Sequence, residues 1–190
     1  MVTFGVIGER GYLGSTVTRR WEELGATWDA IDPEYVVNCV RPDDLALTAR
    51  LAETGNLICP STDAIAEDTD YARAKRVVER TPGAVIIRAG IVDVRQDYPV
   101  AYRNWRCNPI TPLEWADLSW DLRDRPGLHL AGREVVSRHL VASLVAYLWD
   151  EPQPTPGWAD VPLSRVVEDG ERQWNTLAEA LAEYREWLRS

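Results

Sequence analysis

Short apolar runs alternate with amphipathic segments through the first half of the chain. The apolar runs cover residues 2–7, 35–40, 57–60 and 84–87. Between them, apolar residues recur at steps of three and four, which predicts helices over 13–24, 42–55 and 70–80. Strands that are apolar throughout are typical of sheets that are buried on both faces. The pattern therefore predicts a parallel sheet covered by helices on both sides.

The second half has a less regular pattern. Residues 95–125 are polar and aromatic with several prolines, which predicts loops with short helices, and residues 128–131 predict a further strand. Ser137 and Thr176 are N-cap signals, and Thr176 forms a capping-box pattern with Glu179. The first of these helices is expected to carry Leu140, Val141, Leu144, Val145 and Leu148 on one face. The second is expected to direct Leu177, Leu181, Tyr184 and Leu188 inward.

These elements predict an α/β protein with a truncated, Rossmann-like, three-layer parallel sheet. We expect this dinucleotide-binding core in residues 1–94. A small C-terminal α/β lobe that binds substrate is expected in residues 95–190, packed on the core as a single compact unit.

Composition and charge narrow the functional class. The 190 residues carry 21 Lys+Arg and 30 Asp+Glu, a net charge of -9 with no block of like charge, which argues against nonspecific nucleic-acid binding. The longest apolar stretch, 140–149, is too short to cross a bilayer, and no secretory signal pattern is visible. The three cysteines are widely spaced and the two histidines lie away from them in sequence, so we expect no metal site and a reduced, cytoplasmic setting.

Three glycines, Gly8, Gly11 and Gly14, lie between the first predicted strand and the first helix. Glycine here lets the backbone approach a pyrophosphate and lets the helix pack closely on the strand. The free N–H groups at the helix start attract an anion. This GxxGxxG spacing indicates a dinucleotide site, although a tight strand–helix turn without a ligand also uses glycine.

The acidic partner of the adenosine ribose usually follows a second strand about 20 residues on. Asp29 and Asp32 lie near that distance, but only two residues separate Asp32 from the strand at Tyr35, too few for a crossover helix. We therefore expect an abbreviated adenine side, with Asp32 either on the ribose or in a turn before Pro33. The arginines that either meet a 2′-phosphate or remain solvated are Arg10, Arg19, Arg20 and Arg41.

Ser61, Thr62 and Asp63 follow the third strand, at the edge where such sheets bind ligands. Tyr71 and Lys75 then lie four residues apart on one helical face. An ammonium beside a phenol lowers the phenol's pKa, so the tyrosine can exchange a proton with a carbonyl oxygen near neutral pH. A hydroxyl of Ser61 or Thr62 can hold the same oxygen. The alternative is a surface Tyr–Lys pair on an inactive scaffold.

In this order, the motifs resemble the extended short-chain dehydrogenase/reductase family, most closely the dTDP-4-dehydrorhamnose reductases. The similar segments are the glycine loop 8–14, residues 32–40, the strand end 61–63, the YxxxK at 71–75, and residues 86–92, 127–138 and 162–188. The chain is shorter than is usual in this family. The missing length falls after Gly25, between Val40 and Pro42, and between Asp63 and Tyr71.

The resemblance implies a reductase that transfers hydride from NADPH or NADH to the 4-keto carbon of a nucleotide-activated sugar. It implies Tyr71 as proton donor, Lys75 at the nicotinamide ribose, and Ser61 and Thr62 at the substrate carbonyl. The implied cofactor contacts are Gly8, Arg10, Gly11, Tyr12, Leu13, Gly14, Asn38, Cys39 and Val40. Asp63 is placed beside the substrate, and Arg103 and Arg106 are candidates for its diphosphate, with solvated loop residues as the alternative.

Two other functions stay open. One is a non-catalytic dinucleotide- or partner-binding protein on a trimmed reductase scaffold, in which a homodimer or a partner subunit completes the site. The other is an epimerase or a dehydratase on the same scaffold. A dehydratase needs an acidic pair beside the tyrosine, for which Asp68 and Asp70 are the local candidates, with helix-start charges as their simpler role.

Overall fold

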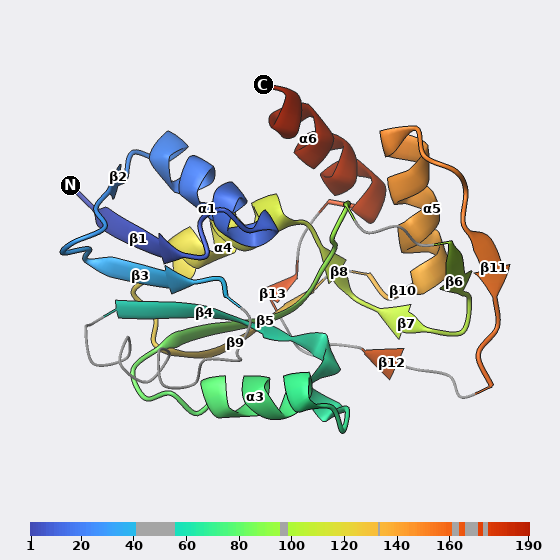
Figure 1. Ribbon diagram of the computed structural model, residues 1–190, viewed down its shortest axis with the longest axis horizontal. Coiled ribbons are helices and arrows are strands. Elements are labelled where there is room, and N and C mark those ends of the chain that lie inside the picture. Colours follow the sequence, from blue (N-terminus) through green and yellow to red (C-terminus); the bar gives the residue numbers. More distant parts are fainter. Residues whose placement is uncertain (41–55, 96–98, 133, 161–163, 166–170, 173–174) are drawn as a thin grey trace. The chain divides into compact units, whose positions relative to one another are not determined.

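The structure is a computed structural model that describes residues 1–40, 56–95, 99–132, 134–160, 164–165, 171–172 and 175–190 (Figure 1). The chain forms two compact units. Unit 1 consists of Met1–Arg88 and Pro112–His129, and unit 2 of Ala89–Thr111 and Leu130–Ser190. The helix predicted over 42–55 lies outside the described residues.

A parallel sheet forms the centre of unit 1. Strand β1 pairs in parallel with β2 and β3, and β3 pairs in parallel with β4. The strand order is β2-β1-β3-β4-β5-β9, and β5 and β9 end in unit 2. The strands are β1 (Thr3–Ile7), β2 (Thr27–Trp28), β3 (Tyr35–Asn38), β4 (Asn56–Thr62), β5 (Val85–Ile91) and β9 (Gly127–Gly132). The predicted Rossmann-like α/β class is confirmed. Strand β2 was not predicted, because two residues are too short to leave a periodic signal.

Helices cover both faces of this sheet. Helices α1 (Tyr12–Glu23) and α4 (Pro112–Leu122) lie on one face, and α3 (Asp70–Val78) lies on the other after the 3₁₀ turn η1 (Asp63–Ala66) (Figure 1). On the α1 side, the rings of Phe4 and Trp21 pack with centroids 5.3 Å apart. The buried cluster on the α3 side contains Val36, Leu57, Cys59, Val78, Ala84 and Ile86.

Helix α4 corrects the prediction of loops with short helices over 95–125. It has 11 residues, and Trp21 Nε1 of α1 donates hydrogen bonds to Ser119 Oγ (3.1 Å) and to the Ala116 carbonyl oxygen (3.3 Å). Residues 112–129 therefore belong to unit 1, whereas the boundary predicted after residue 94 assigns them to the C-terminal lobe. A single boundary in the sequence cannot describe unit 1, because α4 follows residues of unit 2 in the chain and yet packs on α1.

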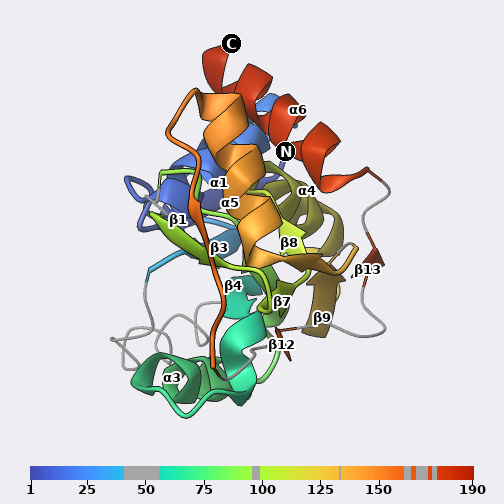
Figure 2. The same cartoon turned by 90° about the vertical axis from the view of Figure 1, so that its right-hand side faces the viewer.

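Unit 2 contains two helices and several short strands. Helices α5 (Arg138–Trp149) and α6 (Leu177–Arg189) pack together, as Figure 2 shows. Strands β8 and β13 pair with the ends of β5 and β9, while β10-β7-β12 and β11-β6 form small sheets. The strands are β6 (Val100–Tyr102), β7 (Arg106–Cys107), β8 (Pro109–Ile110), β10 (Val136–Ser137), β11 (Thr155–Gly157), β12 (Ser164–Arg165) and β13 (Glu171–Arg172).

The helix starts predicted in unit 2 are confirmed. Ser137 Oγ accepts a hydrogen bond from the Leu140 N–H at 3.1 Å, and Thr176 forms a capping box with Glu179. Leu188 was predicted to face inward but is 43% exposed, and Leu140, on the apolar face of α5, is also 43% exposed. The apolar stripe of each helix is wider than the face that it buries.

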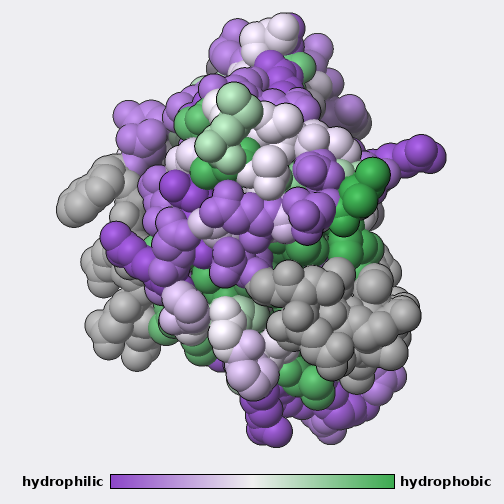
Figure 3. Space-filling model, turned by 90° about the vertical axis from the view of Figure 1, so that its left-hand side faces the viewer, coloured by the Kyte–Doolittle hydropathy of each residue, from purple (hydrophilic) through white to green (hydrophobic). Residues whose placement is uncertain are grey.

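Hydrophilic side chains cover much of the face shown in Figure 3, with smaller hydrophobic areas among them. This surface agrees with the 27% of charged residues in the sequence. Within the ranges that the structure describes, no helix combines the length and the apolar character needed to cross a membrane.

Candidate functional site

The glycine loop joins β1 to α1 in a conformation that requires glycine. Gly8 has a φ of 84°, and a Cβ on Gly14 would lie 2.0 Å from the Gly8 carbonyl oxygen. Gly11 is the N-cap of α1 without a side-chain hydrogen bond, and the first turn holds no acidic residue. Backbone N–H groups without a side-chain cap suit an anion, so the loop fits the pyrophosphate that the sequence predicts here.

The end of β3 lies directly against this loop. A Cβ on Gly8 would lie 3.0 Å from Val40 Cγ1 and 3.4 Å from the carbonyl carbon of Cys39. The Cys39 N–H donates to the Ile7 carbonyl oxygen at 2.9 Å, and Asn38 Oδ1 accepts from the Val40 N–H at 3.3 Å. The structure thus brings together the two segments that were predicted to bind the cofactor.

Tyr71 and Lys75 lie on one face of α3. Lys75 is only 5% exposed, and its Nζ donates to the Pro60 carbonyl oxygen at 2.6 Å. The same Nζ lies 5.7 Å from the ring centroid of Tyr71, which is 44% exposed. Burial lowers the pKa of Lys75, although the thiols of Cys59 and Cys39 act in the opposite direction. A lysine buried in this way differs from the solvated lysine of a surface pair.

An ammonium group carries three N–H donors. Among the described residues, Lys75 has one hydrogen-bond acceptor, the Pro60 carbonyl oxygen. The other donors suit ribose hydroxyls, the partners that the family resemblance implies. Lys75 and the glycine loop therefore both fit NAD or NADP.

Ser61 is tied to a charged pair that the sequence analysis missed. Its Oγ donates to Glu79 Oε1 at 2.6 Å, and Glu79 accepts two hydrogen bonds from Arg88, at 2.8 and 2.6 Å. Burial opposes ionisation of Glu79, but the hydrogen bonds from Arg88 and Ser61 and the charge of Arg88 outweigh it, so the Glu79 pKa lies below its ordinary value. Arg88 in an otherwise apolar strand was the available signal, since a charge there needs a partner.

Thr62 lies at the end of β4 and caps the following turn. Its Oγ1 accepts a hydrogen bond from the Ala64 N–H at 3.1 Å, and the residue is 7% exposed. Thr62 Oγ1 also donates a hydrogen bond to Asp63 Oδ1 at 3.4 Å. The two adjacent hydroxyls therefore have different partners: that of Ser61 is donated to the partly buried Glu79–Arg88 pair, and that of Thr62 lies on the turn.

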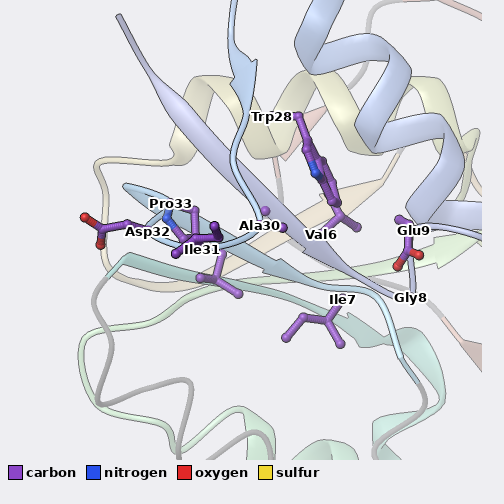
Figure 4. Close-up of a pocket in the computed structure, with 11 residues that line it drawn as sticks. Val6, Ile7, Gly8, Glu9, Trp28, Ala30, Ile31, Asp32 and Pro33 are labelled. Carbon is purple, nitrogen blue, oxygen red and sulfur yellow. The ribbon is translucent and has the colours of Figure 1, made fainter.

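A cavity of about 560 Å³ opens beside the glycine loop (Figure 4). Strand β2 pairs with Thr3 and Phe4 of β1, and the cavity lies along the rest of β1. Its walls include Val6, Gly8, Glu9, Trp28, Ile31 and Asp32. Residues 29–34, all of them described, contain no helix, which confirms that no crossover helix lies between β2 and β3.

Asp29 directly follows β2 and holds the turn at the edge of this cavity. Its N–H donates to the Phe4 carbonyl oxygen at 2.9 Å, and its Oδ1 accepts from the N–H groups of Ile31 (2.8 Å) and Asp32 (3.1 Å). These two hydrogen bonds lower the Asp29 pKa. The carboxylate of Asp32 points away from the other labelled side chains in Figure 4.

The predicted arginines have different surroundings. The side chain of Arg10 is 95% exposed and lies 3.6 Å from Glu9, and Arg41 lies outside the described residues. Arg103 and Arg106 are exposed residues of unit 2, on either side of Trp105. Their contact with a substrate diphosphate stays a prediction.

No family model and no curated protein sequence matches the chain. Solved structures do match its fold. A dTDP-4-dehydrorhamnose reductase from Clostridium acetobutylicum is 16% identical with a TM-score of 0.73, covering 100% of both chains. A dTDP-4-dehydrorhamnose reductase from Bacillus anthracis, in complex with NADP, is 12% identical with a TM-score of 0.71, also covering 100% of both chains. A dTDP-glucose 4,6-dehydratase from Bacillus anthracis, in complex with NAD, is 10% identical with a TM-score of 0.76, covering 100% of this chain and 97% of that one.

These identities show a shared fold. The chain has a Rossmann-like fold that is similar to those of the dTDP-4-dehydrorhamnose reductase and dTDP-glucose 4,6-dehydratase structures.

Proposed function

We propose that the chain is an NAD(P)H-dependent reductase of a nucleotide-activated 4-keto sugar. The observation that carries the proposal is the buried ammonium of Lys75. It lies between the end of β4 and the ring of Tyr71, in the same unit as the glycine loop. The substrate class comes from the names of the structural neighbours, which include dTDP-4-dehydrorhamnose reductases.

The cofactor, when bound, supplies the hydride for this reaction. The backbone of Gly8, Gly11 and Gly14 would hold its pyrophosphate, and Lys75 would bind ribose hydroxyls. The end of β3, which packs against Gly8, would line the middle of the cofactor. Each of these roles uses a group that the fold already holds in place.

Tyr71 donates its phenolic proton to the carbonyl oxygen of the sugar while the carbonyl carbon accepts the hydride. The C=O π bond breaks, a C–H and an O–H bond form, and the ketone becomes a secondary alcohol. The positive charge of Lys75 stabilises the phenolate that remains on Tyr71. We assign the hydrogen bond to the substrate oxygen to Thr62, because the hydrogen bond that its hydroxyl donates to Asp63 Oδ1 is long (3.4 Å), whereas the one from Ser61 to Glu79 is short (2.6 Å). Ser61 is then a positioning residue.

A non-catalytic binding protein is the second candidate. It is favoured by the engagement of Ser61 with Glu79 and by the span of only eight residues between Thr62 and Tyr71. In this case the glycine loop still binds a dinucleotide, or a partner subunit occupies the site, and no hydride is transferred.

The two candidates are separated by incubating the full chain with dTDP-4-dehydrorhamnose and NADH or NADPH. We expect loss of the reduced-nicotinamide absorbance only when the keto sugar is present. Tyr71→Phe should lower kcat by about 100-fold or more without preventing cofactor binding. Tyr147→Phe, at a 76% exposed tyrosine, is the matched control and should have no effect. Cofactor binding without turnover in the unaltered protein would support the second candidate, and absence of dinucleotide binding would contradict the reductase.

A further inference from the structure

We infer that Glu79 is a positioning residue for Lys75, which it holds in a fixed place beside Tyr71 and keeps in the charged form. This inference rests on the proposed function, in which Lys75 acts on the cofactor and on Tyr71 as a cation. Glu79 lies one helical turn beyond the Tyr–Lys pair and outside the YxxxK motif.

Lys75 is the only lysine in the sequence. The chain has 21 lysines and arginines, and the other 20 are arginines. An ammonium is compact and can rotate its three donors, whereas a guanidinium is larger, planar and always charged. The single position with an ammonium is buried and lies against the ring of Tyr71. Its charge and its direction are therefore the properties that the surrounding residues have to maintain.

Glu79 and Lys75 attach two adjacent residues of β4 to α3. Lys75 Nζ donates to the Pro60 carbonyl oxygen at 2.6 Å, and the hydroxyl of Ser61, the next residue, donates to Glu79 Oε1 at 2.6 Å. The Glu79 N–H donates to the Lys75 carbonyl oxygen at 3.0 Å, as in a continued helix. These contacts close a ring through Lys75, Pro60, Ser61 and Glu79. A change at Glu79 is thus transmitted to the residues that hold Lys75.

Arg88 on β5 fixes the orientation of Glu79 in this ring. Its Nε and Nη2 donate to Glu79 Oε1 and Oε2 at 2.8 and 2.6 Å. A two-pronged pair of this kind restricts the plane of the carboxylate. The side chain of Glu79 is 11% exposed, so water and salt screen its charge only weakly. Glu79 is therefore a fixed anion that neutralises Arg88 and lies one helical turn from Lys75.

Glu79 also supplies the negative charge that favours the ammonium form of Lys75. Burial lowers the pKa of Lys75, and this effect is opposed by the negative forms of Cys59, Cys39 and Glu79. Burial raises the pKa of Cys59 to about 12 and also raises that of Cys39, so neither thiol is charged at neutral pH. The phenol of Tyr71 is neutral until it donates its proton. Among the described groups that oppose the effect of burial, Glu79 is the one that is ionised at neutral pH.

A titration of Lys75 tests the inference without depending on turnover. Because the chain has one lysine, protein labelled with carbon-13 lysine gives a single ε-carbon NMR signal, which reports the ionisation of Lys75. In Glu79→Gln we expect the midpoint of this titration to move to lower pH by about one pH unit, because the anion is lost and Arg88 is left unneutralised. Loosening of the structure would act in the opposite direction, since water that reaches Lys75 raises its pKa. An unchanged or higher midpoint would overturn the inference.

The unaltered chain provides a second test that needs no variant to fold. The Glu79 pKa lies below the ordinary 4.5, so the ε-carbon signal of Lys75 should show a second, smaller change below pH 4.5, where Glu79 takes up its proton. Absence of this change in the folded protein would overturn the inference. Glu79→Asp, which keeps the charge, should bring the alkaline midpoint back towards that of the unaltered chain.

Kinetics connect the charge of Lys75 to the proposed reaction. We expect kcat of Glu79→Gln to fall about tenfold with KM little changed, and its loss of activity at alkaline pH to begin about one pH unit lower. Val78→Ala is the matched control, because it removes buried packing from the neighbouring position without changing a charge. It should move neither the titration nor the pH profile. A fall in kcat with an unshifted pH profile would make Glu79 a purely structural residue and overturn the inference. Absence of turnover in the unaltered chain would overturn the proposed function, and the titration would still decide whether Glu79 keeps Lys75 charged.

Discussion

Lys75 Nζ donates a hydrogen bond of 2.6 Å to the main-chain oxygen of Pro60. This hydrogen bond joins α3 to the C-terminal part of β4, and the same Nζ lies 5.7 Å from the ring centroid of Tyr71. Lys75 is only 5% exposed, and burying its charge lowers the free energy of unfolding, since burial favours the neutral form. In the proposed reductase, this charge binds ribose hydroxyls and stabilises the phenolate of Tyr71.

Replacing Lys75 by methionine should separate stability from function. We expect the free energy of unfolding to stay within about 1 kcal/mol or to rise, because a desolvated charge is exchanged for an apolar side chain of similar length. Turnover and dinucleotide binding should fall by about 100-fold. Urea unfolding and cofactor titration measure the two effects. A large loss of stability with cofactor affinity unchanged would make Lys75 a purely structural residue.

The glycine loop should not tolerate a side chain at Gly14. Because a Cβ would lie 2.0 Å from the backbone oxygen of Gly8, Gly14→Ala must displace the loop, and we expect a loss of about 3 kcal/mol in the free energy of unfolding together with loss of cofactor binding. Gly25→Asn is the control, since, apart from its chain neighbours, no described residue has an atom within 4 Å of its Cβ position. It should cost about 1 kcal/mol through its positive φ and leave cofactor affinity unchanged. Normal NADH binding by Gly14→Ala would argue against the loop as the pyrophosphate site.

Much of this fold could be predicted because its strands, loops and helices have recognisable local sequence patterns. The glycine loop, the β3 end and the YxxxK helix follow one another at short range, and their positions were predicted. Three features were missed for physical reasons. Strand β2 is two residues long, α4 packs on α1 from nearly a hundred residues away, and the Ser61–Glu79–Arg88 network joins three elements. Periodicity carries no information on such long-range contacts.

Lowering the pH should reduce the free energy of unfolding as Glu79 becomes protonated. Its folded-state pKa lies below the ordinary 4.5, so its stabilising effect is present above pH 4.5 and is lost as the pH falls through the folded-state value. Glu79→Gln should flatten this part of the pH–stability curve and cost about 2 kcal/mol at pH 7, because Arg88 loses a partly buried, charged partner. Denaturant unfolding at a series of pH values measures both effects.

Glu186→Gln provides the control for that series, since Glu186 pairs with Arg189 at 3.3 Å but is 69% exposed. It should change the free energy of unfolding by less than about 0.5 kcal/mol. If stability falls equally steeply with decreasing pH in Glu79→Gln and in the unaltered protein, another carboxylate determines the acid dependence of stability.

Raising the pH into the alkaline range should reduce the free energy of unfolding as Tyr35 loses its proton. Its hydroxyl donates to Asp124, and this hydrogen bond, together with burial, raises the pKa of Tyr35 to about 12. The raised pKa contributes stability that is fully present below pH 10 and is lost as the pH rises towards about 12. Tyr35→Phe should remove this alkaline dependence and cost about 1 kcal/mol at neutral pH. Tyrosinate absorbance combined with urea unfolding follows the effect, and Tyr147→Phe should leave it in place.

Transfer of an isotopic label tests the reductase proposal most directly. The full chain is incubated with dTDP-4-dehydrorhamnose and with NADH that carries deuterium at the transferable position of its nicotinamide ring, and the sugar product is analysed by mass spectrometry. We predict a secondary alcohol that carries deuterium at the former carbonyl carbon, with little or no labelled product from Tyr71→Phe. An unlabelled, unreduced sugar in the presence of saturating, bound NADH would contradict the proposal and leave a dinucleotide-binding protein.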